Sequence, residues 1–372
     1  MGNPFSKFPL YDHASIVIEI QTPAQNVGQR VQGVVHLDCR QEWSEADKLW
    51  LSIKGKEQVR FVHEEKVQDA DGTGRTKRTP VWNKRVFLEE RKVVFDFSSG
   101  VPVGQFSFPF EFQVPSWAPP SVFLASLKRS RLRIYYKVKA EILSNYSLTR
   151  VEGERRVVVR RPPLEMAAGH MREDRALVKT LCCIDQGLTK IQVCFQSNAY
   201  SCSQQAVCCV EVDNTGCKLP VDKIAFKLKR RIWATAMGRV LQFEGSALTS
   251  QEFPGVEAGQ KMDTQQWSLD LSQAVEEKEF RLTQRISSLK KPYPEEDFIL
   301  SAEPLQASCI GQNMRIEYFL QIATHYGMCD CCRDLPTIKL PLTIYSDQLN
   351  FQQPQLPIPA NWNPVMMQPI FM

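Results

Sequence analysis

The stretch LRIYYKVKAEI, residues 132–142, decides the fold of this 372-residue chain. Apolar residues occupy every second position from Leu132 to Ile142, and arginine, tyrosine, lysine and glutamate occupy the positions between them. Successive side chains of a β-strand point to opposite faces of the sheet, so this stretch buries one face and exposes the other. The pattern is typical of an antiparallel sheet with one solvated face.

The same alternation is found along most of the chain. It is as clear in FSFPFEFQV, residues 106–114, and it returns in runs that begin at Ile16, Val31, Leu49, Ile191, Ile224, Met314 and Ile338. The best helical candidates are short, at residues 172–181 and 270–280. The sequence therefore predicts an all-β protein of the sandwich type.

The runs also repeat at long range. Leu49, Leu51 and Ile53 map onto Ile224, Phe226 and Leu228 at an offset of 175 residues, and the run from Leu132 maps onto the run from Met314 at an offset of 182. We therefore expect two tandem antiparallel immunoglobulin-like β-sandwich domains of the same topology, at residues 15–162 and 180–346. An N-terminal segment (1–14), a linker (163–179) and an extended, unpacked Gln/Pro-containing tail (347–372) complete the expected organisation.

Composition and charge narrow the class of protein. The chain has no run of about 18–20 apolar residues and no N-terminal signal pattern, so we expect a cytoplasmic protein. Its twelve cysteines are too few for a disulfide scaffold, and we expect reduced thiols. Residues 1–162 carry 26 Lys and Arg against 18 Asp and Glu, whereas the remainder carries 20 against 23. The basic first half favours acidic partners.

Several short motifs occur in a consistent order. They are VGQRVQGVV at residues 27–35, FPFEFQVP at 108–115, IYYKVKA at 134–140, KTLCC at 179–183 and LPLTI at 340–344. Together they resemble the arrestin superfamily, most closely the α-arrestins (arrestin-domain-containing proteins), over residues 15–344. The resemblance implies the arrestin fold.

The resemblance also implies a function. It indicates a non-enzymatic cytosolic adaptor or scaffold that binds the cytosolic tails of membrane-protein cargo and links them to endocytic or endosomal trafficking proteins. Such a protein is cytoplasmic and lies peripherally on plasma or endosomal membranes. The alternative is a structural subunit of a stable assembly, like the arrestin-fold subunit of retromer.

Two departures from the family pattern limit the expected partners. Neither Pro119-Pro120 nor Pro162-Pro163 continues into a PPxY motif, so a WW-domain ubiquitin ligase is not expected. Residues 16–20 contain no lysine, which argues against phosphate sensing by paired lysines on the first strand.

Catalytic and cofactor motifs are missing. The five histidines are scattered, and the sequence contains no nucleophile elbow, P-loop or dinucleotide-binding fingerprint. We expect no enzyme, no cofactor, no metal and no nucleic-acid partner. His325, Cys329, Cys331 and Cys332 form the one metal-like group, and half-buried thiols, a zinc site and S-acylation are the alternatives for it.

The candidate site residues fall into three groups. The lipidation candidates are Gly2, within an N-myristoylation pattern, and Cys329, Cys331 and Cys332. The anion- or lipid-binding candidates, which are otherwise a solvated face, are Lys128, Arg129, Arg131, Arg133, Lys227, Lys229, Arg230 and Arg231. Arg75, Lys77 and Arg78 are partner-binding candidates in a polar loop over residues 63–84, which we expect to be exposed and mobile.

Overall fold

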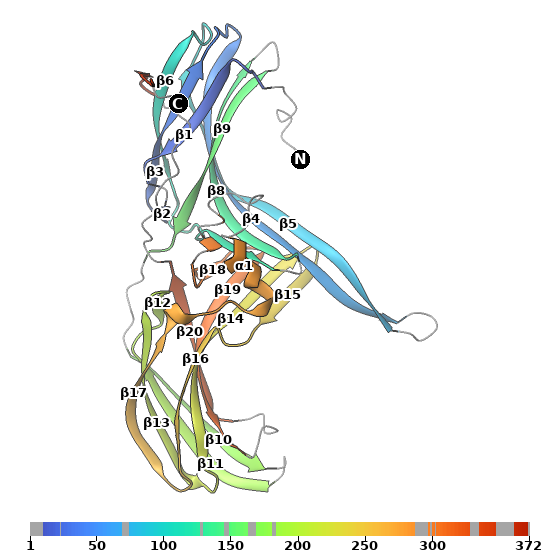
Figure 1. Cartoon of the computed structure of the whole chain (residues 1–372), viewed down its shortest axis with the longest axis vertical. Helices are drawn as coiled ribbons and strands as arrows, with labels where there is room; N and C mark the ends of the chain where they lie inside the picture. The colour runs from blue at the N-terminus through green and yellow to red at the C-terminus, as the bar shows by residue number, and fades with distance from the viewer. Residues whose placement is uncertain are drawn as a thin grey trace.

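Two β-sandwiches lie end to end along the long axis of the molecule (Figure 1). The structure is a computed structural model, and it describes residues 10–22, 24–68, 74–126, 129–144, 149–162, 169–180, 184–286, 297, 300–301, 303–327, 335–346 and 361–370. The all-β fold expected from the alternating runs is confirmed.

The first sandwich is built from two sheets with the strand orders β1-β3-β6-β21 and β2-β9-β8-β4-β5, and β7 pairs with β8. Its strands are β1 (Ala14–Ile20), β2 (Ala24–Asn26), β3 (Arg30–Cys39), β4 (Ala46–Gln68), β5 (Gly74–Asp96), β6 (Gly104–Gln113), β7 (Val122–Ala125), β8 (Arg131–Ser144), β9 (Arg150–Arg160) and β21 (Val365–Met366).

The second sandwich has the orders β10-β11-β13-β17 and β12-β20-β19-β14-β15, with β16 on β14 and β18 on β19. Its strands are β10 (His170–Thr180), β11 (Ile184–Phe195), β12 (Ala199–Ser201), β13 (Gln205–Cys217), β14 (Val221–Ala236), β15 (Arg239–Glu244), β16 (Thr249–Val256), β17 (Lys261–Asp270), β18 (Cys309–Ile310), β19 (Met314–His325) and β20 (Thr337–Tyr345).

The two sandwiches share one topology, as the offset repeat predicts. The order β1-β3-β6 corresponds to β11-β13-β17, and β2-β9-β8-β4 corresponds to β12-β20-β19-β14. Even the parallel pairing of β2 with β9 has its counterpart in β12 with β20. The buried hydroxyl of Tyr136 donates to the Pro119 carbonyl, and that of Tyr318, 182 residues later, donates to the Gln306 carbonyl.

The polar segment expected to be an exposed, mobile loop over residues 63–84 is a β-ribbon where the structure describes it, so the expected loop is wrong, whereas the expected exposure is found at residues 74–80. β4 and β5 pair from Lys48–Asp96 out to Gln68–Gly74, with register shifts after Leu49 and after Gly55. Figure 1 shows this ribbon projecting sideways from the middle of the molecule. Backbone pairing between two strands of equal length replaces the loop.

Two further expectations are wrong at least in part. The helical candidate at residues 172–181 is strand β10 as far as Thr180, and this strand occupies much of the segment expected to be linker. The tail is extended where the structure describes it, but it is not free of the first sandwich, because β21 adds to the edge of β6 and the Met367 amide donates to the Ser107 carbonyl. The other helical candidate is partly right: η2 (Leu271–Gln273) and η3 (Lys278–Phe280) are 3₁₀ turns, and α1 (Arg281–Arg285) follows.

The junction between the sandwiches is held by buried polar contacts. Glu57 of β4 accepts hydrogen bonds from the backbone amides of Gln312 and Asn313, at 3.2 and 2.9 Å. Asp297, which is 2% exposed, bonds to Arg133 and Arg156. A small apolar cluster that contains Phe123 and Ile286 lies beside these contacts. No helix in the described part of the chain is long and apolar enough to cross a membrane.

Candidate functional site

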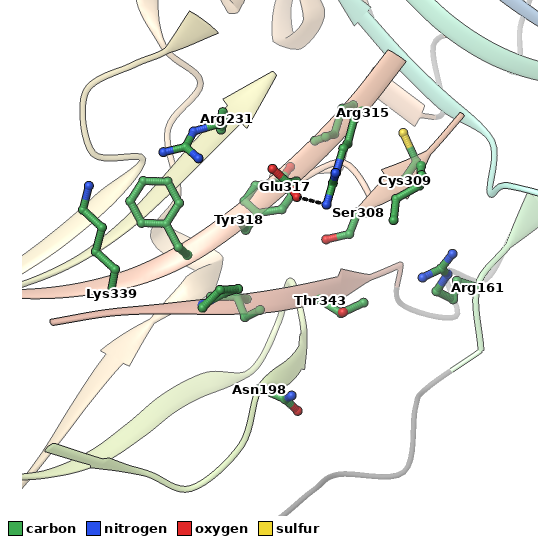
Figure 2. A pocket seen from close by; sticks show the side chains of 15 residues that line it. Arg161, Asn198, Arg231, Ser308, Cys309, Arg315, Glu317, Tyr318, Lys339 and Thr343 are labelled. Carbon is green, nitrogen blue, oxygen red and sulfur yellow. Dashed lines mark ion pairs between the residues drawn. The ribbon is translucent and has the colours of Figure 1, made fainter. Parts of the chain in front are cut away.

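A basic groove lies on the second sandwich, against β19 and β20. It encloses about 530 Å³, and its charged lining residues are Arg161, Arg231, Arg315, Lys339 and Glu317. Figure 2 shows Lys339 and Arg231 at one end and Arg161 at the other, with the Arg315–Glu317 ion pair between them. The lining thus carries four cationic side chains and one carboxylate.

Strand alternation places these groups on one face. Arg231 of β14 lies opposite Glu317 of β19, and Phe319 lies opposite Pro341 of β20. The intervening residues Leu320 and Leu340 point to the core and are at most 2% exposed. The groove is therefore built on the face opposite to the core, where the pattern of the sequence places polar residues.

An aromatic ring holds two of the cations in position. The Arg231 guanidinium carbon lies 5.6 Å and the Lys339 ammonium 5.1 Å from the centre of the Phe319 ring. Both distances are within the roughly 6 Å over which a ring face attracts a cation. Glu244 of β15 accepts from Arg231 at 2.6 Å and lies 3.8 Å from Lys339. Phe319 and Glu244 thus orient both cations without filling the groove.

The pKa of Glu244 reports a positive field, whereas that of its neighbour Lys229 is lowered mainly by burial. Burial alone would raise the pKa of Glu244, but the hydrogen bond from Arg231 and the charges of Arg231, Lys339 and Lys229 hold it below its ordinary value. Burial lowers the pKa of Lys229, Glu244 opposes this shift, and Lys339 and Lys227 add to it. A positive field of this kind attracts an anionic ligand.

The arrangement suits recognition of carboxylate or phosphate groups. An arginine side chain has five N–H donors, and Glu317 and Glu244 engage only some of those on Arg315 and Arg231. Phe319, Pro341 and the exposed Ile310 add apolar surface beside the charges. A half-open groove with cations and an apolar floor fits a short extended segment that contains acidic residues.

Equivalent positions of the first sandwich are also cationic. Lys54 and Lys56 correspond to Lys229 and Arg231 at the offset of 175 residues. The pKa of Lys56 is lowered to about 8, first by burial and then by the charges of Lys137, Lys84 and Lys54, with Glu154 opposing. Both sandwiches therefore present basic faces on corresponding strands.

The anion-binding candidates on β14 lie on two different faces of the strand. Arg231 lines the groove, and Lys229 and Lys227 lie on the same face beside it. Arg230 is wrong as an anion-binding residue, because its side chain is 1% exposed and bonds to the buried carboxylates of Glu276 and Glu277. Alternation explains this, since Arg230 shares the inward face with Leu228 and Ile232.

The candidates expected near β8 have different roles. Arg129 is exposed, whereas Arg131 is half-buried on the strand. Arg133 is committed to the domain junction, where it bonds to Gln58 at 2.8 Å and to Asp297 at 3.3 Å. Lys128 lies outside the described residues.

The partner-binding candidates lie on the ribbon. Arg75, Lys77 and Arg78 are exposed on β5, and Arg78 pairs with Glu64 at 3.1 Å. None of the three lines the groove, and the residues opposite them in the ribbon are Val67, Glu65 and Glu64 of β4. Gly2, Cys329, Cys331 and Cys332 lie outside the described residues, and within those residues no three His, Cys, Asp or Glu side chains gather as metal ligands.

Sequence reasoning missed most of the groove. Arg161, Arg315, Glu317, Phe319 and Lys339 were not among the candidates. The alternation of the runs from Met314 and Ile338 does indicate that Arg315 and Lys339 face solvent. Their proximity to Arg231 depends on the pairing of β14 with β19 and of β19 with β20, which connects residues far apart in the chain.

Comparison with known families gives matches over both sandwiches. Residues 15–164 match the family model for "Arrestin (or S-antigen), N-terminal domain", and residues 185–349 match that for "Arrestin (or S-antigen), C-terminal domain". No individual curated protein matches the chain. The two domain matches occur in the order of the two sandwiches and cover most of the sequence.

Proposed function

Because the chain belongs to the arrestin superfamily, we propose that it is an adaptor that binds an acidic, extended segment of a partner protein in the basic groove. Arrestin-family domains in general serve adaptor roles in trafficking and signalling. The finer assignment, to membrane-protein cargo and endocytic or endosomal machinery, is part of this proposal. So is the placement among the α-arrestins.

The composition of the groove carries the proposal. Four cations surround the hollow of about 530 Å³, and the carboxylates of Glu317 and Glu244 balance only part of their charge. The groups are half-exposed, so a ligand reaches them without unfolding any strand: the exposed fractions of the Lys339 and Arg315 side chains are 47% and 51%. Complementary charge steers such a ligand and sets its register.

The proposed occupant is the cytosolic tail of a membrane protein. Such tails are extended chains, and an acidic stretch within one supplies the carboxylates that the groove lacks. The apolar floor at Phe319 and Pro341 favours an apolar residue between the acidic ones. The opposite end of the adaptor would then be available to trafficking proteins.

An array of synthetic cytosolic-tail peptides tests the proposal. Each acidic peptide is paired with a version in which Asp and Glu are replaced by Asn and Gln, and the array is probed with the full chain. We expect retention of acidic peptides and loss of their amide partners. Lys339→Glu combined with Arg161→Glu should remove retention, whereas Lys218→Glu, on an exposed residue directly after β13, should leave it intact. Retention that ignores both peptide charge and the double substitution would reject the groove.

A structural subunit of a stable assembly is the competing role. Size-exclusion chromatography coupled to mass spectrometry of native extract separates the two. A constant complex with stoichiometric partners at every salt concentration favours the assembly. An adaptor should instead dissociate from its partners as salt screens the groove, because exposed charges more than about 10 Å apart interact weakly at 0.1 M ionic strength.

Peripheral membrane association is the last part of the proposal. A myristoyl chain on Gly2 would bind membranes only marginally, so a second attraction is needed, and the basic excess of residues 1–162 is suited to anionic lipid. Gly2→Ala should shift the protein from the membrane fraction to the cytosol. If the intact mass of the native protein shows an unmodified Gly2, the proposed membrane association through a myristoyl chain is rejected.

A further inference from the structure

We propose that Cys194 and Cys209 are a redox-sensitive thiol pair, which glutathione disulfide converts reversibly into a disulfide between β11 and β13. The two residues lie directly opposite each other in the antiparallel register of these strands. Both thiols are free in the structure. The site is on the sheet that carries no part of the basic groove, so it is independent of the proposed function.

Exposure singles out this pair. Of the seven cysteines in the described part of the chain, Cys194 and Cys209 are half-exposed and the other five are buried. Their neighbours Val193, Phe195, Cys208 and Val210 are 0% exposed, which leaves the side chains of Cys194 and Cys209 on the outer face of the sheet. Among the cysteines that the structure describes, the two thiols that solvent reaches are thus the two that lie opposite each other.

The backbone spacing permits a bond. The Gln196 amide donates to the Val207 carbonyl at 3.1 Å, so that pair, two positions along, is hydrogen-bonded. Pair types alternate along an antiparallel ladder, and Cys194–Cys209 is therefore also a hydrogen-bonded pair with Cα atoms about 5.5 Å apart. Disulfides span Cα distances of about 4.4–6.8 Å.

The fit is close but not relaxed. Cβ atoms of directly opposite residues are about 4.5–5.5 Å apart, with hydrogen-bonded pairs at the wider end of this range, whereas disulfides prefer about 3.5–4.5 Å. The strands must approach slightly when the bond forms. Strained or exposed disulfides have more oxidising potentials and are the readily reduced ones. The bond is therefore suited to switching and not to permanent stabilisation.

The neighbouring thiol is suited to stay out of the reaction. Burial, followed by the charges of Cys209 and Cys194, raises the pKa of Cys208. Thiolates are the nucleophiles in thiol–disulfide exchange, so a buried, protonated thiol reacts slowly. Adjacent Cys208 and Cys209 are thus distinguished by the face to which each points.

The reaction is a two-step exchange. One thiolate of the pair attacks a sulfur of glutathione disulfide, forms a mixed disulfide and releases one glutathione thiolate. The second thiolate then attacks the protein sulfur of the mixed disulfide, forms the Cys194–Cys209 bond and releases the second glutathione. The two thiols lose two electrons and two protons, and the glutathione disulfide takes up both and leaves as two reduced glutathione molecules.

Peptide mapping of the full chain tests the proposal. The protein is equilibrated in buffers of graded glutathione-to-glutathione-disulfide ratio, quenched with acid and an alkylating agent, and digested with chymotrypsin. Trypsin is unsuitable, because residues 191–218 contain no Lys or Arg before Lys218 and both cysteines stay in one peptide. Chymotrypsin cleaves after Phe195 and Tyr200, so the two cysteines remain joined only through the disulfide. Glutathione disulfide also avoids oxidising Met171, which lies opposite Cys194 on β10.

We expect the linked peptide pair to increase with the glutathione disulfide fraction and to disappear on return to reduced glutathione. Cys209→Ser should abolish the linkage and leave a mixed disulfide on Cys194. Cys208→Ala, the matched control, should retain the linkage. Separate glutathione adducts on Cys194 and Cys209 of the unaltered chain, without linked peptides at any ratio, would overturn the proposal. Linkage to Cys202 or Cys208 in place of Cys209 would do the same.

Discussion

Arg230 shows how much a single residue depends on partners that are distant in the chain. Its guanidinium is buried in the second sandwich and bonds to Glu276 and Glu277, with the Phe280 ring 5.4 Å from its Cζ atom. Fully buried arginines are rare unless paired, and removing one partner of such a group is strongly destabilising. Strand alternation predicts that Arg230 points inward. The carboxylates, 46 and 47 residues later, follow only from the tertiary structure.

This cluster makes stability depend on pH. Burial raises the pKa of Glu277 to about 7 from an ordinary value of 4.5; the Arg230 charge opposes the shift and Glu276 adds to it. The folded state therefore holds a proton that the unfolded chain releases. The stabilisation from Glu277 is complete below about pH 4.5 and is lost as the pH rises through about 7.

Glu277→Gln should remove this dependence. Glutamine does not titrate, so the variant should not lose stability through this group as the pH rises across this interval. The free energy of unfolding of the variant, relative to that of the unaltered protein, should therefore increase by a few kcal/mol. Urea unfolding at a series of pH values measures the difference. Glu279→Gln, on an exposed carboxylate of the same segment, is the control. Curves for Glu277→Gln and the unaltered protein that run parallel would contradict the assignment.

At the scale of elements, the strands with regular alternation of apolar residues could be predicted from the sequence. The strands at the edges of the sheets, such as β10, the distal part of β5 and β21, could not. β8 and β19 follow directly from residues 132–142 and 314–322, where apolar residues occupy every second position. β10 was expected to be helical because its pattern, in ALVK for example, is ambiguous in period. Pairing with β11 decides it, since packing overrides weak local propensity.

The ribbon and the tail escaped prediction for a related reason. Residues 63–66 and 74–79 are polar on both faces, and solvated strands of that kind lack the alternation that marks a half-buried sheet. The tail contributes β21, a strand of two residues, to an existing sheet edge. Neither element buries enough apolar surface to produce a recognisable hydrophobic pattern in its sequence.

Shortening the ribbon should leave the fold intact. Replacing residues 66–76 with Asn-Gly would join Glu65 to Lys77, which already lie opposite each other, through a two-residue hairpin turn. Residues 74–80 are exposed, so we expect the free energy of unfolding to change by less than about 0.5 kcal/mol. Urea denaturation measures it. A large loss of stability would indicate that the distal ribbon packs against the body.

At the scale of the whole molecule, two equivalent sandwiches are joined by polar contacts that could not be predicted from the sequence. The repeat at offsets of 175 and 182 predicts two domains of one topology, and the strand orders agree. The contacts of Glu57 with Gln312 and Asn313 bridge residues about 255 apart. No periodicity links such positions, and neither the junction nor the groove could be assembled without the register of the strands.

Glu57→Gln should weaken this junction. Both carboxylate oxygens accept hydrogen bonds, so an amide group places N–H donors against donors and leaves at least one buried group unsatisfied. We expect a loss of about 1–3 kcal/mol in the free energy of unfolding. Calorimetry should also show the transitions of the two sandwiches moving apart. Glu64→Gln, in an exposed pair on the same strand, should change neither; an unaltered Glu57→Gln profile would show that the sandwiches are joined by other contacts.

The affinity of the basic groove for an acidic tail peptide is the most direct test of the account. Fluorescence anisotropy would give the dissociation constant of an array-selected peptide, at low and high salt, for the unaltered chain and for Lys339→Glu with Arg161→Glu. We expect salt to weaken binding and the double substitution to weaken it by about tenfold or more, which corresponds to about 1.4 kcal/mol. Lys84→Glu, on the basic face of the first sandwich, should bind as the unaltered chain does. Equal affinity of all three proteins, or a salt-independent affinity, would contradict the groove as the binding site.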